Sequence, residues 1–326
     1  MNKEQKTQTH EWAKNNTMKA VRVHHFGGIK AMVYEEVPLP VPGNEQVLVS
    51  VKAAGVGPWD AWVRSGQSAL PQPLPLTLGS DLSGIIQAVG PGVSKFQIGD
   101  EVFGVTNAQF TGAYAEFAIA QMGMIALKPP QISHIEAAAL PVVASTAWQM
   151  VFDHGQVDHT KRVLIHGAAG NVGAYAVQLA KRAGAEVTAT AFTHSLDFVR
   201  TLGADHVIDV NTTRFEKEAM DVDVVIDTIG GDTLDRSFAV LKAGGVLVSA
   251  VESPDQDKAR RYGVRALFFL VSVTTLGLTQ ISDLAMSSQL HINLGEVLPL
   301  SQAPLAHGML AGAPHKPGKI VLTVDP

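Results

Sequence analysis

The chain has 326 residues, of which 46% are hydrophobic and 17% charged; its formal net charge is −5 and it contains no cysteine. This length favours two globular domains, and the lack of cysteine excludes disulfides, thiol catalysis and thiolate zinc sites. Because the charge is negative and no basic cluster occurs, we expect neither nucleic acid nor an anionic membrane as a partner.

The first 17 residues are polar and lack the apolar core of a signal peptide, so 1–17 is predicted to be a flexible extension. The longest apolar stretch, Val264–Val273, contains Arg265 and is too short to cross a bilayer. We therefore expect a cytoplasmic protein without a membrane anchor.

Residues 18–130 are predicted to be rich in β structure. Apolar residues alternate with polar ones, and glycine and proline interrupt the segments as tight turns require. The Pro-rich run Leu70–Leu76 cannot be helical and is predicted to be an extended surface loop. The predicted strands are Ala20–Val23, Gln46–Val51, Ser83–Val89 and Asp100–Val105.

The pattern changes at Ser133, which forms a capping box with Glu136. Strands and helices then alternate, which predicts an α/β fold with a parallel, doubly wound sheet. The tail after residue 271 is predicted to hold one helix and strands ending at Lys319–Val324, and to return to the N-terminal domain. The alternating elements are strands Val163–His166, Glu186–Ala191, Val222–Asp227, Gly245–Ala250 and Arg265–Val271, and helices Val172–Ala183, Ser195–Leu202 and Asp232–Gly244.

A glycine-rich loop between the first of these strands and its helix predicts a dinucleotide site. Such a loop needs a residue for the tight turn, one that lets pyrophosphate approach, and one small enough for helix–strand packing. We assign these roles to Ala168, Gly170 and Gly173. A ligand-free turn is the alternative, and the alternating elements that follow argue against it. The predicted contacts are Ala168, Ala169, Gly170, Asn171, Val172 and Gly173.

The end of the second strand predicts which dinucleotide is bound. NAD sites usually place an acid there, whereas Ala191–Ser195 contains none. Thr193, His194 and Ser195 can donate to a 2′-phosphate, so we predict NADPH. Ser195 can equally cap the following helix.

Later strand ends supply further predicted contacts, because ligands bind along the carboxyl edge of such sheets. Thr228 and Gly230 follow the fourth strand, although a plain turn explains the paired glycines almost as well. Val251 and Phe269 follow or end neighbouring strands and can present backbone groups to the carboxamide.

From Met18 onward the sequence resembles the zinc-independent quinone oxidoreductase (zeta-crystallin-like) family of the medium-chain dehydrogenase/reductase superfamily. The resemblance implies a GroES-like β-barrel domain (18–143 and 272–326) and a Rossmann domain (144–271). It also implies that Thr146 lies near the nicotinamide, and a homodimer formed through the sheet edge at Ala266–Val271, for which burial in the monomer is the alternative. The motifs are Ala54–Asp60, Leu78–Gly84, Val89–Val93, Gly99–Val102, Gly112–Glu116, the loop at 167–173 and Gly318–Leu322.

Zinc enzymes of the superfamily carry cysteine at the position of Gly57 and a His–Glu pair at Ser80-Asp81, and the third ligand would fall in the apolar Leu140–Ala144. We therefore expect no metal. The resemblance places Gly57, Trp59 and Trp62 in the substrate pocket.

Many relatives have asparagine at position 57 and tyrosine at position 62, so the usual polar groups are missing and the catalytic residue is unassigned. The proton donors considered are Asp60, Tyr114, Tyr262 and water.

Without a metal to polarise a carbonyl, hydride transfer to an electron-poor alkene or quinone is favoured over alcohol oxidation. The sequence therefore predicts an NADPH-dependent reductase of quinones or α,β-unsaturated carbonyls. The alternatives are an enoyl-thioester reductase and a catalytically weak NADPH-binding interaction or sensor protein.

Overall fold

The computed structural model describes residues 17–324 and divides the chain into two units. The second unit consists of Val143–Ser272 and Ser287–His291, and the remaining residues form the first. The predicted N-terminal domain includes 287–291, whereas the structure groups these residues with the second unit. The predicted flexible extension lies outside the described residues, except for Thr17, which is the first residue of strand β1.

The second unit contains a six-stranded parallel sheet in the order β11-β10-β9-β12-β13-β14. Numbered along the chain this is 3-2-1-4-5-6, the doubly wound order, so the predicted sheet is confirmed. Every residue of the central strand β12 is buried, as a strand covered on both faces requires. The strands are β9 (Arg162–Ile165), β10 (Glu186–Ala191), β11 (His206–Asp209), β12 (Val222–Asp227), β13 (Leu241–Ser249) and β14 (Arg265–Phe268).

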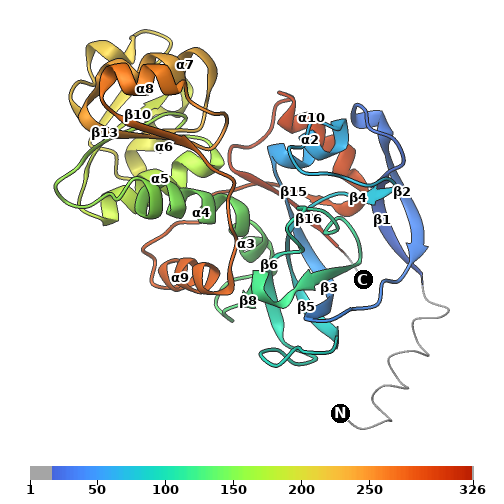
Figure 1. The fold of residues 1–326 in the computed structure, drawn as a ribbon. Helices are drawn as coiled ribbons and strands as arrows, with labels where there is room; N and C mark the ends of the chain where they lie inside the picture. Colours follow the sequence, from blue (N-terminus) through green and yellow to red (C-terminus); the bar gives the residue numbers. More distant parts are fainter. Residues whose placement is uncertain (1–16, 325–326) are drawn as a thin grey trace. The chain divides into compact units, whose positions relative to one another are not determined.

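Helices cover both faces of this sheet. In Figure 1, α7 and α8 lie on one side of the strands and α5 on the other. Gln178 of α5 holds the segment 287–291, since its side chain donates to the carbonyl of His291 (3.3 Å) and accepts from the His291 N–H (2.7 Å). The helical elements are α4 (Pro141–Trp148), a π-helical turn (Gln149–His154), α5 (Asn171–Arg182), α6 (Leu196–Thr201), α7 (Gly231–Ser237) and α8 (Gln256–Tyr262).

The predicted helix Asp232–Gly244 is wrong in its second half. Helix α7 ends at Ser237, and Leu241 is already the first residue of β13. Leu234, Phe238 and Leu241 nevertheless share one buried cluster. Their helical spacing therefore reflects a common core that the chain reaches from a helix, a 3₁₀ turn and a strand. The last strand is also shorter than predicted and ends at Phe268.

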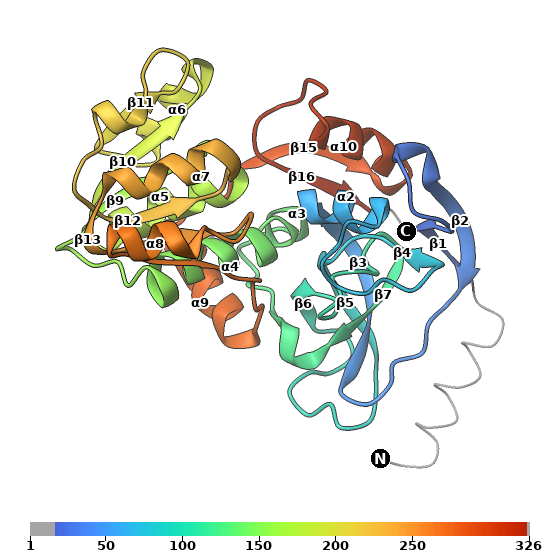
Figure 2. The same cartoon turned by 45° about the horizontal axis from the view of Figure 1, so that its top comes forward.

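The first unit contains a seven-stranded and a three-stranded sheet. The C-terminal tail joins the larger one, because β16 pairs antiparallel with β3, with Leu322 opposite Ala54. Figure 2 shows β15 and β16 beside α10. The strands are β1 (Thr17–Val23), β2 (Met32–Pro38), β3 (Gln46–Val56), β4 (Leu76–Thr77), β5 (Asp81–Val89), β6 (Glu101–Val105), β7 (Phe117–Gln121), β8 (Ile125–Leu127), β15 (Leu294–Pro299) and β16 (Lys319–Thr323).

Four helices belong largely to this unit: α2 (Pro58–Ser65), α3 (His134–Ala138), α9 (Thr275–Met286) and α10 (Ala303–Leu310). The Ser133 capping box is confirmed, since the backbone N–H of Glu136 donates to the Ser133 hydroxyl at 3.2 Å. The tail holds two helices where one was predicted. The second, α10, is only eight residues long and contains Gly308, which weakens its helical signal.

The packing at the start of α5 predicts a difference between two helical glycines. A Cβ at Gly173 would lie 2.2 Å from the Gly167 carbonyl oxygen. Among the described residues, one at Gly277 of α9 would meet only the Thr274 hydroxyl, at 3.4 Å. We expect Gly173→Ala to lower the free energy of unfolding by about 2 kcal/mol. The matched Gly277→Ala should leave it unchanged or raise it by about 0.5 kcal/mol. Urea unfolding of both variants tests this, and equal midpoints would contradict it.

Candidate cofactor site and substrate pocket

The glycine-rich loop joins β9 to α5 within the second unit. Gly167 has a positive φ of 70°, and Gly170 is the N-cap of α5, with extended backbone. The tight-turn role assigned to Ala168 therefore belongs to Gly167; Ala168 is fully buried and its N–H donates to the carbonyl of Thr190 at 3.1 Å. Gly173 packs against Gly167, as its assigned role requires.

The loop leaves room for an anion at the start of α5. Gly170 is exposed, and within residues 17–324 a Cβ there would meet only the Gly167 carbonyl oxygen, at 3.2 Å. In the described part of the chain, α5 has no side-chain capping hydrogen bond at its N-cap, Gly170. Ala169, Asn171 and Val172 are half-buried around it. Helix N–H groups and the helix dipole favour a phosphate here, so these residues fit a dinucleotide.

An acid that the sequence analysis missed lies beside the turn after β10: Asp209, the last residue of β11. The Thr193 hydroxyl donates to Oδ2 of Asp209 at 2.7 Å and accepts from the Asn211 amide at 3.0 Å. Thr193 is thus committed to Asp209, contrary to its predicted role as a phosphate donor. His194 stacks on Phe192, with the ring centroids 5.9 Å apart. Ser195 precedes α6 without capping it through its side chain.

Two buried residues, Asp227 and Ser249, hold the loops at the next strand ends. Asp227 accepts from the N–H groups of Ile229 (3.1 Å) and Gly230 (3.0 Å). Its other oxygen accepts from the Ser249 hydroxyl at 2.8 Å, and that hydroxyl accepts from the N–H of Val251 at 3.1 Å. One carboxylate therefore positions both loops that contain predicted contacts. Sequence reasoning noted only the glycines beside it.

The remaining residues of this unit that are predicted to contact the dinucleotide are Thr228, Thr146 and Phe269. Their side chains are buried or already contact other parts of the protein. The Thr228 hydroxyl donates to the carbonyl of His166 at 2.8 Å, which ties the β12 end to the glycine-rich loop. Thr146 is buried on α4. The ring of Phe269 lies 4.5 Å from that of His154, so its side chain is occupied within the protein.

The three predicted pocket residues belong to α2 and its N-cap in the first unit: Gly57 is the N-cap, and Trp59 and Trp62 lie in the helix. A Cβ at Gly57 would lie 2.1 Å from the Trp59 indole, so the indole fills the space of a side chain at position 57. The Trp59 N–H donates to the Ser80 hydroxyl at 2.9 Å. Trp62 is 46% exposed and can contact a ligand.

A buried ion pair lies beneath Trp59. Lys319 Nζ is 2.8 Å from Oδ2 of Asp81 and 4.3 Å from the Trp59 ring centroid, and both charged side chains are almost fully buried. Asp81 also accepts from the Val142 N–H at 3.1 Å. Its carboxylate is therefore committed to protein donors, and with Gly57 and Ser80 beside it the residues here do not fit a catalytic zinc. Residues 17–324 hold no group of three or more His, Cys, Asp or Glu side chains suited to a metal.

The side chains considered as proton donors differ in burial and in hydrogen bonding. Tyr114 donates from its hydroxyl to Oδ2 of Asp60 at 3.0 Å, and both side chains are fully buried. Oδ2 of Asp60 also accepts from the Gly57 N–H at 2.8 Å, whereas Oδ1 has no hydrogen-bond partner among the described residues. Burial raises the pKa of Asp60 to about 7. Tyr262, on α8 of the other unit, is 46% exposed.

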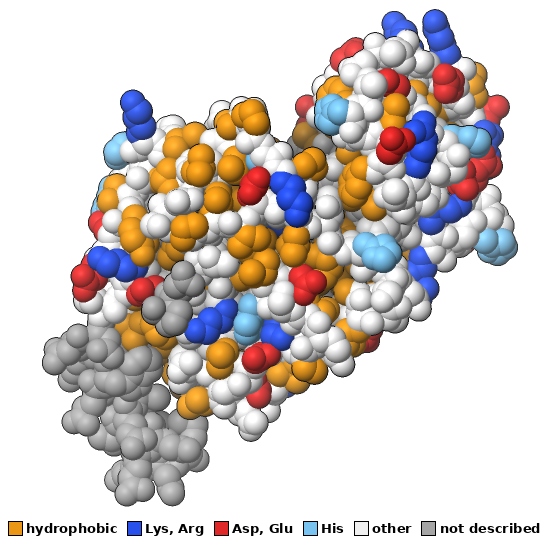
Figure 3. Space-filling view, turned by 180° about the vertical axis from the view of Figure 1, so that it is seen from behind, with side chains coloured by type: hydrophobic (Ala, Val, Ile, Leu, Met, Phe, Trp, Pro, Cys, Tyr) orange, Lys and Arg blue, Asp and Glu red, His pale blue; other side chains and the backbone are white. Residues whose placement is uncertain are grey.

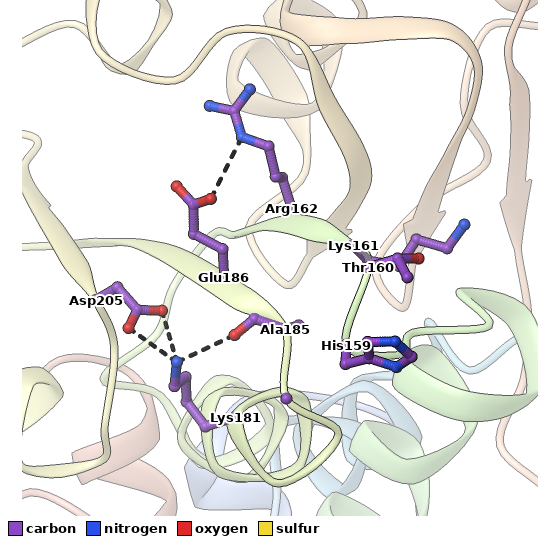
Figure 4. Close-up of a pocket in the computed structure, with 9 residues that line it drawn as sticks. His159, Thr160, Lys161, Arg162, Lys181, Ala185, Glu186 and Asp205 are labelled. Atoms are coloured by element: carbon purple, nitrogen blue, oxygen red, sulfur yellow. Dashed lines mark hydrogen bonds and ion pairs between the residues drawn. The ribbon is translucent and has the colours of Figure 1, made fainter.

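A separate polar cavity of about 290 Å³ lies where β9 and β10 begin (Figure 4). Lys181 donates to both oxygens of Asp205 there, and Arg162 lies 3.7 Å from Glu186. These pairs neutralise most of the local charge. The cavity is at the amino edge of the parallel strands, away from the carboxyl edge where such sheets bind ligands.

The surface charge and the helix lengths concern two possible partners, nucleic acid and the membrane. Acidic and basic side chains are interspersed on the face shown in Figure 3. No helix within the described residues is long and apolar enough to cross a membrane.

Comparison with known proteins identifies both units. Residues 43–130 match the family model of the alcohol dehydrogenase GroES-like domain, and residues 202–322 match that of zinc-binding dehydrogenases. A quinone oxidoreductase of Mus musculus is 32% identical over 94% of this chain and 97% of its own length. The quinone oxidoreductase structure from Coxiella burnetii is 32% identical, with a TM-score of 0.89 over 95% of this chain and 100% of that one. A mycobacterial structure in complex with NADPH is 28% identical, with a TM-score of 0.83 over 94% and 99%.

A GroES-like domain joined to a doubly wound parallel sheet with a glycine-rich loop defines a medium-chain dehydrogenase/reductase. Within that superfamily the chain belongs to the quinone oxidoreductase family. It is therefore an oxidoreductase.

The exposed position of Gly170 predicts a variant that folds but does not bind. Aspartate is a favourable N-cap, which offsets the tight 3.2 Å approach of its Cβ to the Gly167 carbonyl oxygen, so Gly170→Asp should keep an unfolding midpoint close to that of the wild type. Its carboxylate would repel the pyrophosphate, and we expect dinucleotide affinity to fall at least about 100-fold. Titration by fluorescence or calorimetry measures this. The isosteric Gly170→Asn is the uncharged control and should lose less affinity; wild-type binding by Gly170→Asp would refute the loop assignment.

The burial of Asp60 predicts a pH dependence of stability. Its pKa is raised from 3.8 to about 7 in the folded state, so protonation favours folding. This stabilisation is complete below the unfolded pKa and is lost as the pH rises through about 7. Relative to Asp60→Asn, the wild type should lose up to about 4 kcal/mol of unfolding free energy across this window. Urea unfolding at a series of pH values tests this, and parallel curves for the two proteins would contradict it.

Proposed function

We propose that the protein is an NADPH-dependent reductase that transfers hydride to a quinone or an α,β-unsaturated carbonyl without a metal. The observation that carries the proposal is the exposed, side-chain-free start of α5 at Gly170, in a chain of the quinone oxidoreductase family. The bound dinucleotide would supply the hydride. The chain itself supplies the site that binds and orients it and that excludes water from the acceptor.

The residues that would hold the dinucleotide lie along the carboxyl edge of the parallel sheet. The loop at 167–173 would bind the pyrophosphate, and His194 and Ser195 lie at the turn after β10, next to the predicted ribose site. The loops positioned by Asp227 and Ser249 would lie on the nicotinamide side. NADPH is proposed because Ala191–Ser195 contains no acid and because a related mycobacterial structure holds NADPH.

The chemistry of the acceptor follows from the groups around Gly57. Trp59 and Trp62 offer aromatic surface, and none of the groups at positions 57, 80 and 81 is free to hold a zinc ion. A planar, electron-poor acceptor needs stacking and a proton source, and not a Lewis acid. Because Asp60 and Tyr114 are fully buried and hydrogen-bonded to each other, water is the proposed proton donor.

The proposed assembly is a homodimer joined through β14. This strand is at the edge of the six-stranded sheet, so its outer backbone groups can pair with a second copy.

Steady-state turnover tests the proposal. Oxidation of NADPH, and separately of NADH, is followed with a panel of quinones, enones and crotonyl thioesters. We expect turnover with quinones or enones and a higher kcat/KM with NADPH. Exclusive use of the thioester would make the protein an enoyl-thioester reductase. Tight NADPH binding without any turnover would support the interaction or sensor alternative and reject the enzymatic proposal.

A further inference from the structure

We infer that Asp209 is a specificity-determining residue which limits how strongly the protein prefers NADPH over NADH. This inference rests on the proposed function, because it concerns the ribose end of the same dinucleotide site. It assigns a role to a residue that lies outside the Ala191–Ser195 turn in sequence.

The sheet brings Asp209 to the turn. Strands β10 and β11 are parallel neighbours, and Asp209 lies opposite Ala191, the last residue of β10. The turn that follows Ala191 therefore begins beside a carboxylate. In a doubly wound sheet the end of this second strand is where the 2′ position of the adenine ribose is read.

Two hydrogen bonds hold the carboxylate there, and a third joins its two partners. One oxygen accepts from the Thr193 hydroxyl (2.7 Å) and the other from the Asn211 backbone N–H (2.9 Å). The Asn211 amide in turn donates to the Thr193 hydroxyl at 3.0 Å. Thr193 has its proton committed to Asp209, so it cannot also donate that proton to a 2′-phosphate.

The charge of Asp209 is not cancelled nearby. In the part of the chain that the structure describes, no Lys or Arg forms an ion pair with it. Arg214, the nearest Lys or Arg in sequence, is paired with Glu216 at 3.0 Å, and Arg200 is paired with Asp197 at 2.6 Å. Asp209 is also half-buried, which reduces screening by solvent. A phosphate dianion at the ribose would be repelled, whereas the hydroxyl of NADH carries no charge to repel.

Equilibrium binding of both dinucleotides tests the inference. Asp209→Asn removes the charge and keeps the size. Asp221→Asn is the matched control, because it makes the same charge change just before β12, at the amino ends of the parallel strands, whereas Asp209 lies at the carboxyl ends. Dissociation constants for NADPH and NADH are measured by fluorescence titration at low and at high salt.

We expect Asp209→Asn to bind NADPH about tenfold more tightly at low salt, with the NADH constant changed less than about twofold. The gain should shrink toward about twofold in 0.5 M salt, because the effect is electrostatic. Asp221→Asn should leave the ratio of the two constants unchanged. Retained NADH binding shows that the variant site is folded; Asp209→Ser replaces Asp209→Asn if that binding is lost.

An unchanged NADPH/NADH ratio in Asp209→Asn, or an equal shift of both constants, would overturn the inference while leaving the proposed function intact. Failure of the wild type to bind either dinucleotide would overturn the proposed function and this inference together.

Discussion

The contact between Gly173 and the carbonyl of Gly167 determines the geometry of the candidate cofactor site. A Cβ at Gly173 would lie 2.2 Å from that oxygen, so α5 can start this close to β9 only because residue 173 is glycine. The positive φ of Gly167 turns the chain, and Gly170 begins the helix without a side chain above its N–H groups. Backbone packing, and not charged side chains, therefore leaves the start of α5 suited to an anion.

Carboxylates complete the two units in different ways. In the second unit, Asp227 and Asp209 each end a strand at the same edge of the sheet, with two strands between them. Asp227 organises two loops through N–H groups and the Ser249 hydroxyl, and Asp209 places a charge beside the turn after β10. In the first unit, Asp81 is neutralised by Lys319 beneath the Trp59 indole. The position that carries metal ligands in zinc relatives is thus filled by an aromatic ring and a buried ion pair.

The sequence predicted the parts that depend on local pattern. The β10 and β12 strands, the Ser133 capping box and the glycine-rich loop were found because periodicity and turn residues specify them directly. The predictions from sequence were wrong where residues far apart in the chain come into contact. Leu241 continued a helical spacing that in fact reflects a shared core, and Thr193 was judged without Asp209, which only strand pairing brings to it. Gly167 was passed over for Ala168 because the turn conformation is a backbone property.

Transfer of deuterium from NADPH that carries deuterium at both hydrogen positions of C4 tests the central claim most directly. The labelled cofactor is mixed with an enone and with protein dialysed against a chelator, and the product is examined by mass spectrometry and NMR. The account predicts deuterium on the β-carbon of the reduced product, at a rate that chelation does not alter. Product without deuterium, or activity that is lost on chelation and restored by zinc, would contradict it.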